Sequence, residues 1–243
     1  MENRVHKSCV GSLFLAFGVV LVCANAGIAG EGLRSEIENV AINSLLQPEV
    51  TFTLTDNQGN PLTLEEVSAR FILARLEIVN AEKGSERYYS YTTRTQTVPE
   101  GYPNAGQSAV QATYDSGGTF QELGPGRYQY IFSTALPNDY NQTLTHTMSA
   151  QIERETDEKL FVANPLFHFV PAGGDVEVLR NVVTTQACNK CHTSLGIHGG
   201  GRKEVGLCLL CHNPQSTDPD TGNTVDMAIM THKIHRGAGL PSV

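Results

Sequence analysis

The chain has 243 residues, of which 40% are hydrophobic and 17% are charged, and its formal net charge is −8. This length gives room for one or two domains with a hydrophobic core. The acidic balance and the lack of any lysine/arginine run argue against nucleic acid as a partner.

Residues 1–29 have the pattern of an export signal peptide. Arg4 and Lys7 give it a positively charged start, and the apolar run Val10–Cys23 is too short to span a bilayer. Ala24–Ala26 is an A-x-A cleavage site, so we predict an exported protein. Lipidation of the cysteine that ends the apolar run is the alternative, although a valine rather than a small residue precedes that cysteine.

Residues 30–177 carry the pattern of an all-β domain. Period-two alternation predicts strands at Glu49–Leu54 and Arg127–Ser133. Further strands are expected at Phe71–Ile78, Tyr88–Thr97, Val110–Tyr114, Leu144–Glu153, Leu160–Ala163 and Leu166–Val170. Turns rich in glycine, proline and asparagine separate them. We therefore predict a mainly β N-terminal domain, built as a Greek-key sandwich or a split barrel.

Two stretches of this region are less regular. Glu31–Leu46 mixes polar and apolar residues and is expected to be a short helix or an arm, and Leu64–Arg75 is expected to start as a short helix. His146 and His168 lie in strand-like runs, so we interpret them as packed or surface side chains rather than as ligands. No catalytic motif appears in this region.

The composition changes near residue 180. All 9 phenylalanines and 8 tyrosines lie before this point, whereas most of the 8 histidines lie after it. A segment without aromatic residues cannot bury enough apolar surface to offset its ordering entropy. We therefore predict that residues 178–243 form an irregular segment with short helices, packed around a bound group.

The bound group is indicated by two C-x-x-C-H units, the attachment signature of c-type haem. In such a unit both cysteines form thioethers with the porphyrin, and the histidine that follows them binds the iron. The units are Cys188, Cys191 and His192, and then Cys208, Cys211 and His212. We predict two covalently attached haems c. Two C-x-x-C pairs also fit a structural zinc site, but zinc held by four thiolates has no use for a histidine after each pair.

Three further histidines can supply the second axial ligands of the irons: His198, His232 and His235. His232 and His235 lie three residues apart in a helix predicted at Thr224–His235, so they would serve two different haems. His198 precedes three glycines, which would let the backbone pass close to a porphyrin. Three histidines for two irons leave one over, which indicates a third haem attached to another segment. The alternative is that some of these histidines are exposed and bind nothing.

The motifs C-N-K-C-H, I-H-G-G-G-R, C-L-L-C-H-N-P and M-T-H-K-I-H-R-G resemble the first haem-bearing domain of the outer-membrane decahaem cytochromes of the OmcA/MtrC type. The resemblance is specific over about residues 178–243 and only architectural over 31–177. It implies bis-histidine haem irons, with His198, His232 and His235 at places where histidines recur in the family. Because a decahaem member carries more haem sites, the chain resembles a member truncated after its N-terminal β domain and first two sites.

Our leading hypothesis from these patterns is an electron carrier rather than an enzyme. The resemblance implies transfer to other redox proteins or to extracellular acceptors such as metal oxides, in the periplasm, at the outer membrane or on the surface of a Gram-negative bacterium. The alternatives are a haem enzyme with an open iron site that reduces a small oxyanion, a zinc-stapled binding module, and a non-functional remnant.

Overall fold

The computed structural model describes residues 31–80 and 85–237, so the predicted export signal lies outside the described residues. Its strands are β1 Arg34–Ile42, β2 Pro48–Thr55, β3 Ser68–Asn80, β4 Ser85–Ser90, β5 Thr93–Thr97, β6 Ser108–Ala112, β7 Thr119–Gly124, β8 Arg127–Ile131, β9 His146–Glu155, β10 Leu160–Ala163 and β11 Leu166–Phe169. Its helices are the 3-10 turn η1 Leu64–Glu66, followed by α1 Thr185–His192, α2 Val205–Cys211 and α3 Met227–Arg236.

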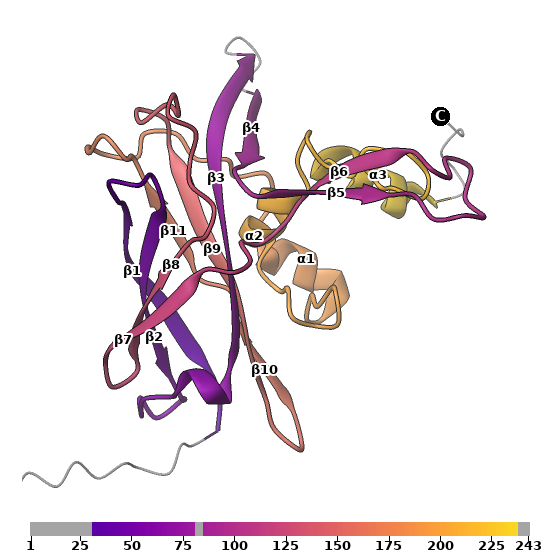
Figure 1. The fold of residues 1–243 in the computed structure, drawn as a ribbon. Helices are drawn as coiled ribbons and strands as arrows, with labels where there is room; N and C mark the ends of the chain where they lie inside the picture. The colour runs from indigo at the N-terminus through magenta and orange to yellow at the C-terminus, as the bar shows by residue number, and fades with distance from the viewer. Residues whose placement is uncertain (1–30, 81–84, 238–243) are drawn as a thin grey trace, which may run out of the picture.

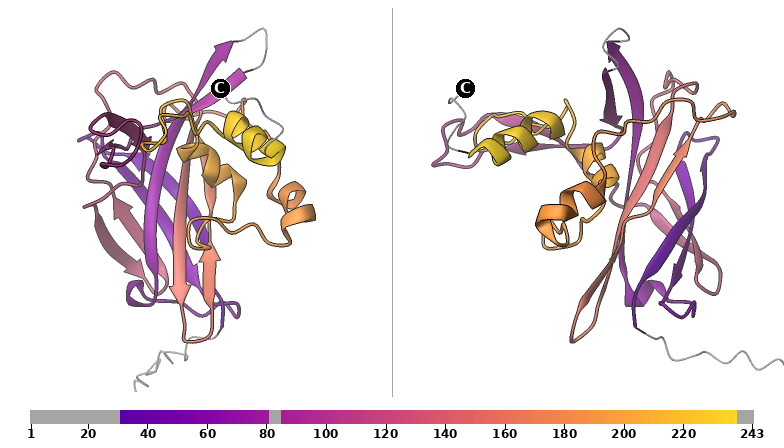
Figure 2. Two further views of the ribbon diagram at one scale, coloured as in Figure 1. Left: turned by 90° about the vertical axis from the view of Figure 1, so that its right-hand side faces the viewer. Right: turned by 180° about the vertical axis from the view of Figure 1, so that it is seen from behind.

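The strands form two larger antiparallel sheets and a separate hairpin (Figure 1). The first sheet has the order β1-β2-β8-β7, and the second has the order β10-β9-β3-β4 with β11 also paired to β9. The hairpin β5-β6 projects away from both sheets and runs beside the segment that ends in α3 (Figures 1 and 2). The predicted fold class, a mainly β domain followed by a segment with short helices, is confirmed.

The main core lies between the two sheets and is rich in aromatic rings. Phe52 of β2 and Phe71 of β3 are fully buried, with ring centroids 4.9 Å apart. Tyr130 of β8 stacks on Phe71 at 5.0 Å. Each such ring removes a large apolar area from water, and pairs at these distances add a favourable contact of their own. Ten of the chain's 17 phenylalanine and tyrosine residues lie in this core or pack against it.

Strand β3 is buried on both of its faces. Phe71 and Leu73 point into the core between the sheets, whereas Ile72, Ala74 and Leu76 belong to a second apolar cluster on the outer face. A strand covered on both sides needs a continuous apolar run rather than an alternating one. The apolar run F-I-L-A in β3 therefore indicates that a second layer of the protein covers the outer face of this strand.

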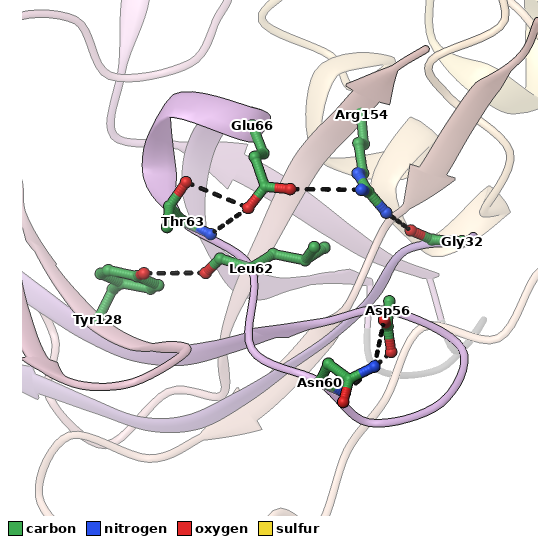
Figure 3. Close-up of polar contacts among 8 residues, drawn as sticks. All are labelled: Gly32, Asp56, Asn60, Leu62, Thr63, Glu66, Tyr128 and Arg154. Atoms are coloured by element: carbon green, nitrogen blue, oxygen red, sulfur yellow. Dashed lines mark hydrogen bonds and ion pairs between the residues drawn. The ribbon is translucent and has the colours of Figure 1, made fainter. Parts of the chain in front are cut away.

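A polar network closes the sandwich where β3 begins (Figure 3). One carboxylate oxygen of Glu66 accepts a hydrogen bond from the Thr63 backbone N–H at 2.8 Å, which completes a capping box around η1. The other oxygen accepts from the buried Arg154 at 3.3 Å, and Arg154 also donates to the Gly32 carbonyl at 2.9 Å. These bonds tie β9 to the chain entering β1.

Three expectations differ from the structure. The helix or arm expected at Glu31–Leu46 is wrong, because this stretch forms β1, whose bulge between Ile37 and Asn39 breaks the alternation. The single strand expected at Tyr88–Thr97 is divided between β4 and β5, and β7 was not predicted. The helix expected from Leu64 is a single 3-10 turn. Of the helices in the described ranges, none has the length and apolar character that a membrane crossing requires.

Candidate haem-binding site

Helix α2 anchors the C-terminal segment on the outer face of the second sheet. Its apolar residues Val205, Leu207, Leu209 and Leu210 are buried in the cluster that also contains Ile72 of β3. The C-terminal segment was predicted to lack a sizeable core of its own. Its apolar residues are instead buried against the β-sheet. The packing fixes the second C-x-x-C-H unit, because this unit begins within α2 and ends at its C-cap.

Hydrogen bonds from β4 and from the projecting hairpin hold the chain around this unit. The Ser90 hydroxyl donates to the Leu210 carbonyl at 2.6 Å, and the Ser90 backbone N–H donates to the Gln215 side chain at 2.7 Å. Further along, Thr217 N–H donates to the Val110 carbonyl of β6 at 3.0 Å. The loop that follows His212 is thus held on two sides by β-structure.

The structure brings His212 and His198 together, with ring centroids 6.1 Å apart and ring planes inclined by 31°. The Nδ1–H group of His212 donates to the Val225 carbonyl at 3.0 Å, which leaves its Nε2 as the ring nitrogen with a free lone pair. His198 has a backbone φ of 54°, a region that non-glycine residues rarely occupy. Strain of this kind persists where the surrounding structure requires it and occurs preferentially at functional sites.

His192 and His235 form a second ring pair, with centroids 6.0 Å apart and planes inclined by 77°. His192 is the last residue of α1, and His235 lies in the last turn of α3. The Nδ1–H group of His235 donates to the Thr231 carbonyl at 2.8 Å, so its Nε2 again carries the lone pair. His232 makes the same kind of bond to the Ala228 carbonyl at 2.6 Å but is exposed, and it faces no partner ring within the part of the chain described.

Both pairs have the spacing of two imidazoles that share one metal. With imidazole–metal bonds of about 2.0 Å and ring nitrogens roughly 1.15 Å from each centroid, two imidazoles on opposite sides of a metal have centroids about 6.3 Å apart. The two measured separations, 6.0 and 6.1 Å, agree with this value. In each pair one histidine follows a C-x-x-C unit and the other does not. The histidines of each pair would therefore fit the iron of one haem.

Comparison with known proteins finds outer-membrane and multihaem cytochromes. Residues 180–240 match the outer-membrane cytochrome MtrC/MtrF-like domains II/IV. The multihaem cytochrome MtrC of Shewanella baltica (strain OS185) is 25% identical over 169 residues, which cover 61% of this chain and 25% of that protein. The chain is related to the outer-membrane cytochromes of the MtrC/OmcA type. The resemblance predicted from the sequence is confirmed.

Solved structures extend the MtrC/OmcA-type likeness to the β-sandwich. The crystal structure of the outer-membrane decahaem cytochrome OmcA has a TM-score of 0.67 and 26% identity, over 85% of this chain and 33% of that one. The crystal structure of MtrC from Shewanella baltica OS185 has a TM-score of 0.61 and 22% identity, over 86% of this chain and 33% of that one. The chain thus spans about a third of these structures.

The second C-x-x-C-H unit opens onto an apolar cavity. Leucine, isoleucine and methionine side chains line it together with Cys208, Cys211, His198 and His212. Burial raises the pKa of both thiols to about 11 and lowers the pKa of His212. The histidine is therefore neutral and able to bind a metal at pH 7, whereas the thiols resist the ionisation that zinc ligation needs.

The arrangement of the cysteines also differs from a zinc cluster. The four residues are free cysteines within two separate helices. Among the described residues, no group of three or more histidine, cysteine, aspartate or glutamate side chains lies close enough together to hold a metal ion. The two histidine pairs, not the four thiols, are the feature of this segment that is compatible with a metal.

Sequence reasoning missed several residues that position the ligands. Asp226 caps α3 by accepting a hydrogen bond from the Ala228 N–H at 3.1 Å, and an aspartate ahead of an apolar helical stretch is a signal that could have located this helix start. Ser90, Gln215 and Val225 act through tertiary contacts. Their roles leave no local pattern in the sequence.

Proposed function

We propose that this chain is an electron carrier with two covalent bis-histidine haems. The first haem site consists of Cys188 and Cys191 with His192 and His235 as iron ligands. The second haem site consists of Cys208 and Cys211 with His212 and His198. The observation that carries this proposal is the pairing of histidine rings at 6.0 and 6.1 Å, each pair containing one histidine of a C-x-x-C-H unit.

The chain's own residues define what these sites do. When bound, haem iron alternates between its ferric and ferrous states and so exchanges one electron at a time. Two histidines on each iron would leave no position for a substrate, which favours an electron carrier over an enzyme that reduces a small oxyanion. The backbone carbonyls of Val225 and Thr231 orient one histidine of each pair and fix its tautomer.

Helix α3 keeps the two sites close to each other. Met227 at its start donates its N–H to the His212 carbonyl at 3.0 Å, and His235 in its last turn faces His192. With a rise of 1.5 Å per residue, Met227 and His235 lie about 12 Å apart along the helix axis. The short span supports electron exchange between the two sites.

The remaining parts take supporting roles in this proposal. Residues 30–177 form a scaffold domain that fixes α2, and residues 178–243 form the haem-binding domain. His232 is a candidate ligand for a third haem attached to another segment. Because the relatives are named as outer-membrane cytochromes, we propose that this protein is exported and works at the outer membrane. Its partners would be other redox proteins or extracellular electron acceptors.

Haem stoichiometry and absorption spectra of protein exported in a host that matures c-type cytochromes test the proposal. The expected result is two covalent haems per chain, both low-spin in the oxidised and reduced states. A high-spin haem would select the enzyme alternative. Bound zinc without iron would overturn the proposal.

A further inference from the structure

A second cavity beside the second haem site is lined by positive charge. Three arginines contribute to it, together with the buried Tyr114. We call it the arginine pocket, and its charged members are Arg70, Arg94 and Arg202. His198 and His212 line the same cavity. The pocket thus places cationic groups directly beside both proposed iron ligands of one site.

Two of these arginines have only neutral hydrogen-bond partners in the described ranges. Arg202 donates through Nε to the Gln151 side chain at 2.9 Å and lies 5.1 Å above the Tyr114 ring. Arg94 donates to the Gln111 side chain at 2.8 and 3.1 Å. Both retain N–H groups for a further acceptor, because a guanidinium carries five of them.

Arg70 differs, since its charge is shared with a carboxylate. It lies 3.7 Å from Glu153, whose side chain also accepts a hydrogen bond from Gln151 at 2.9 Å. Glu153 therefore offsets one of the three positive charges and leaves the other two. The chain has a formal net charge of −8, yet in its described part neither Arg94 nor Arg202 pairs with an acidic side chain.

Arg202 also lies beside the ligands themselves. It lines the apolar cavity together with His198, His212 and Cys208. Its positive charge is therefore close to any group that binds in that cavity.

We infer that Arg94 and Arg202 bind the propionate carboxylates at the second haem site and raise the reduction potential of that haem. The inference rests on the proposed function, since it assumes a haem there. Guanidinium groups bind carboxylates through paired, charge-assisted hydrogen bonds. A positive charge near the iron favours the ferrous state, which has one positive charge fewer.

A redox titration of the matured, two-haem protein tests this inference. In Arg202→Gln, the reduction potential of one of the two haems is expected to fall. At a fixed applied potential, the ferrous-to-ferric ratio of that haem should be roughly tenfold smaller. A unit charge roughly 10 Å away, acting through an effective dielectric constant of about 20, gives a change of this size. For one electron, tenfold corresponds to about 59 mV. Arg202→Lys keeps the charge and should shift the potential less.

Matched variants show which haem responds. Arg94→Gln alters an exposed residue and provides a second test if Arg202→Gln fails to mature. Arg127→Gln is the control, because Arg127 pairs with Glu38 at 2.7 Å in the first sheet and should leave both potentials unchanged. The haem that shifts must be the one that becomes high-spin in His198→Ala. A shift confined to the other haem, or no shift in either arginine variant, would overturn the inference.

A free anion is the other source of a matching negative group. If propionates fill the pocket, adding inorganic phosphate at constant ionic strength leaves both potentials unchanged. If phosphate moves the potential of the second haem in the original protein and not in Arg94→Gln, the pocket binds a free anion and the inference is wrong. These outcomes all require two haems per chain, so the proposed function is tested first and separately.

Discussion

Replacing His235 by alanine tests the assignment of the first haem site most directly. Its ring lies 6.0 Å from that of His192, against about 6.3 Å for two imidazoles on one metal. The variant should therefore leave one of the two irons five-coordinate. The measurement is carbon monoxide binding to the reduced protein, which should rise from none to one equivalent per chain, together with a high-spin signal from half of the haem.

His232 provides the matched control for this change. It lies on the same helix, is exposed like His235 and makes the same type of Nδ1–H bond to a carbonyl four residues earlier. Alanine at either position favours the helix by about 0.5 kcal/mol, so neither variant should unfold α3. His232→Ala is expected to leave both haems low-spin. Carbon monoxide binding in His232→Ala but not in His235→Ala would refute the pairing.

Three further predictions concern stability. Phe71→Ala should lower the free energy of unfolding by about 3–5 kcal/mol in urea titrations, whereas Leu45→Ala, at a side chain 71% exposed, should change it by less than about 0.5 kcal/mol. Burial lowers the pKa of His146, so below about pH 6.5 the unfolded state binds more protons than the folded state. The free energy of unfolding should therefore fall by up to about 1.4 kcal/mol per pH unit as the pH drops towards 5. His146→Gln should remove this part of the slope; an unchanged slope would contradict the assignment. Replacing the four C-x-x-C-H cysteines by alanine should abolish hydrogen-exchange protection in α1 and α3 while the sandwich stays protected, and equal protection in all of them would be the contrary result.

The strands with clean alternation could be predicted from the sequence because one face of each is buried. The strand predicted at Arg127–Ser133 corresponds to β8, which pairs with β2. The predicted hairpin is formed by β9 and β10, which pair in antiparallel fashion. Strand β1 was missed because its bulge shifts the alternation between Ile37 and Asn39. Strand β7 was missed because five of its six residues are exposed, and an exposed edge strand carries no burial pattern.

The candidate site shows the same division between local and tertiary information. The C-x-x-C-H units and the three further histidines follow from residue type and spacing alone. Which histidine faces which could not be derived, because the partners are separated by 14 residues in one pair and by 43 in the other. The arginine pocket depends on the hairpin placing Arg94 at the same cavity as Arg202, which follows α1, and no local pattern encodes this arrangement.

The three helices of the C-terminal segment are held in different ways. The two proposed haem sites are therefore positioned by different interactions. Helix α2 buries four apolar residues on the sheet, so half of the second site is fixed by ordinary packing. Helices α1 and α3 bury no residue fully and have 8 and 10 residues, a length at which an isolated helix is marginal in water. His192 and His235 meet between these two helices. Ligation of one iron by both would join α1 to α3, so the first haem is expected to act as a structural crosslink as well as a redox centre. The second site would then be positioned by the β-sandwich, and the first by its own cofactor.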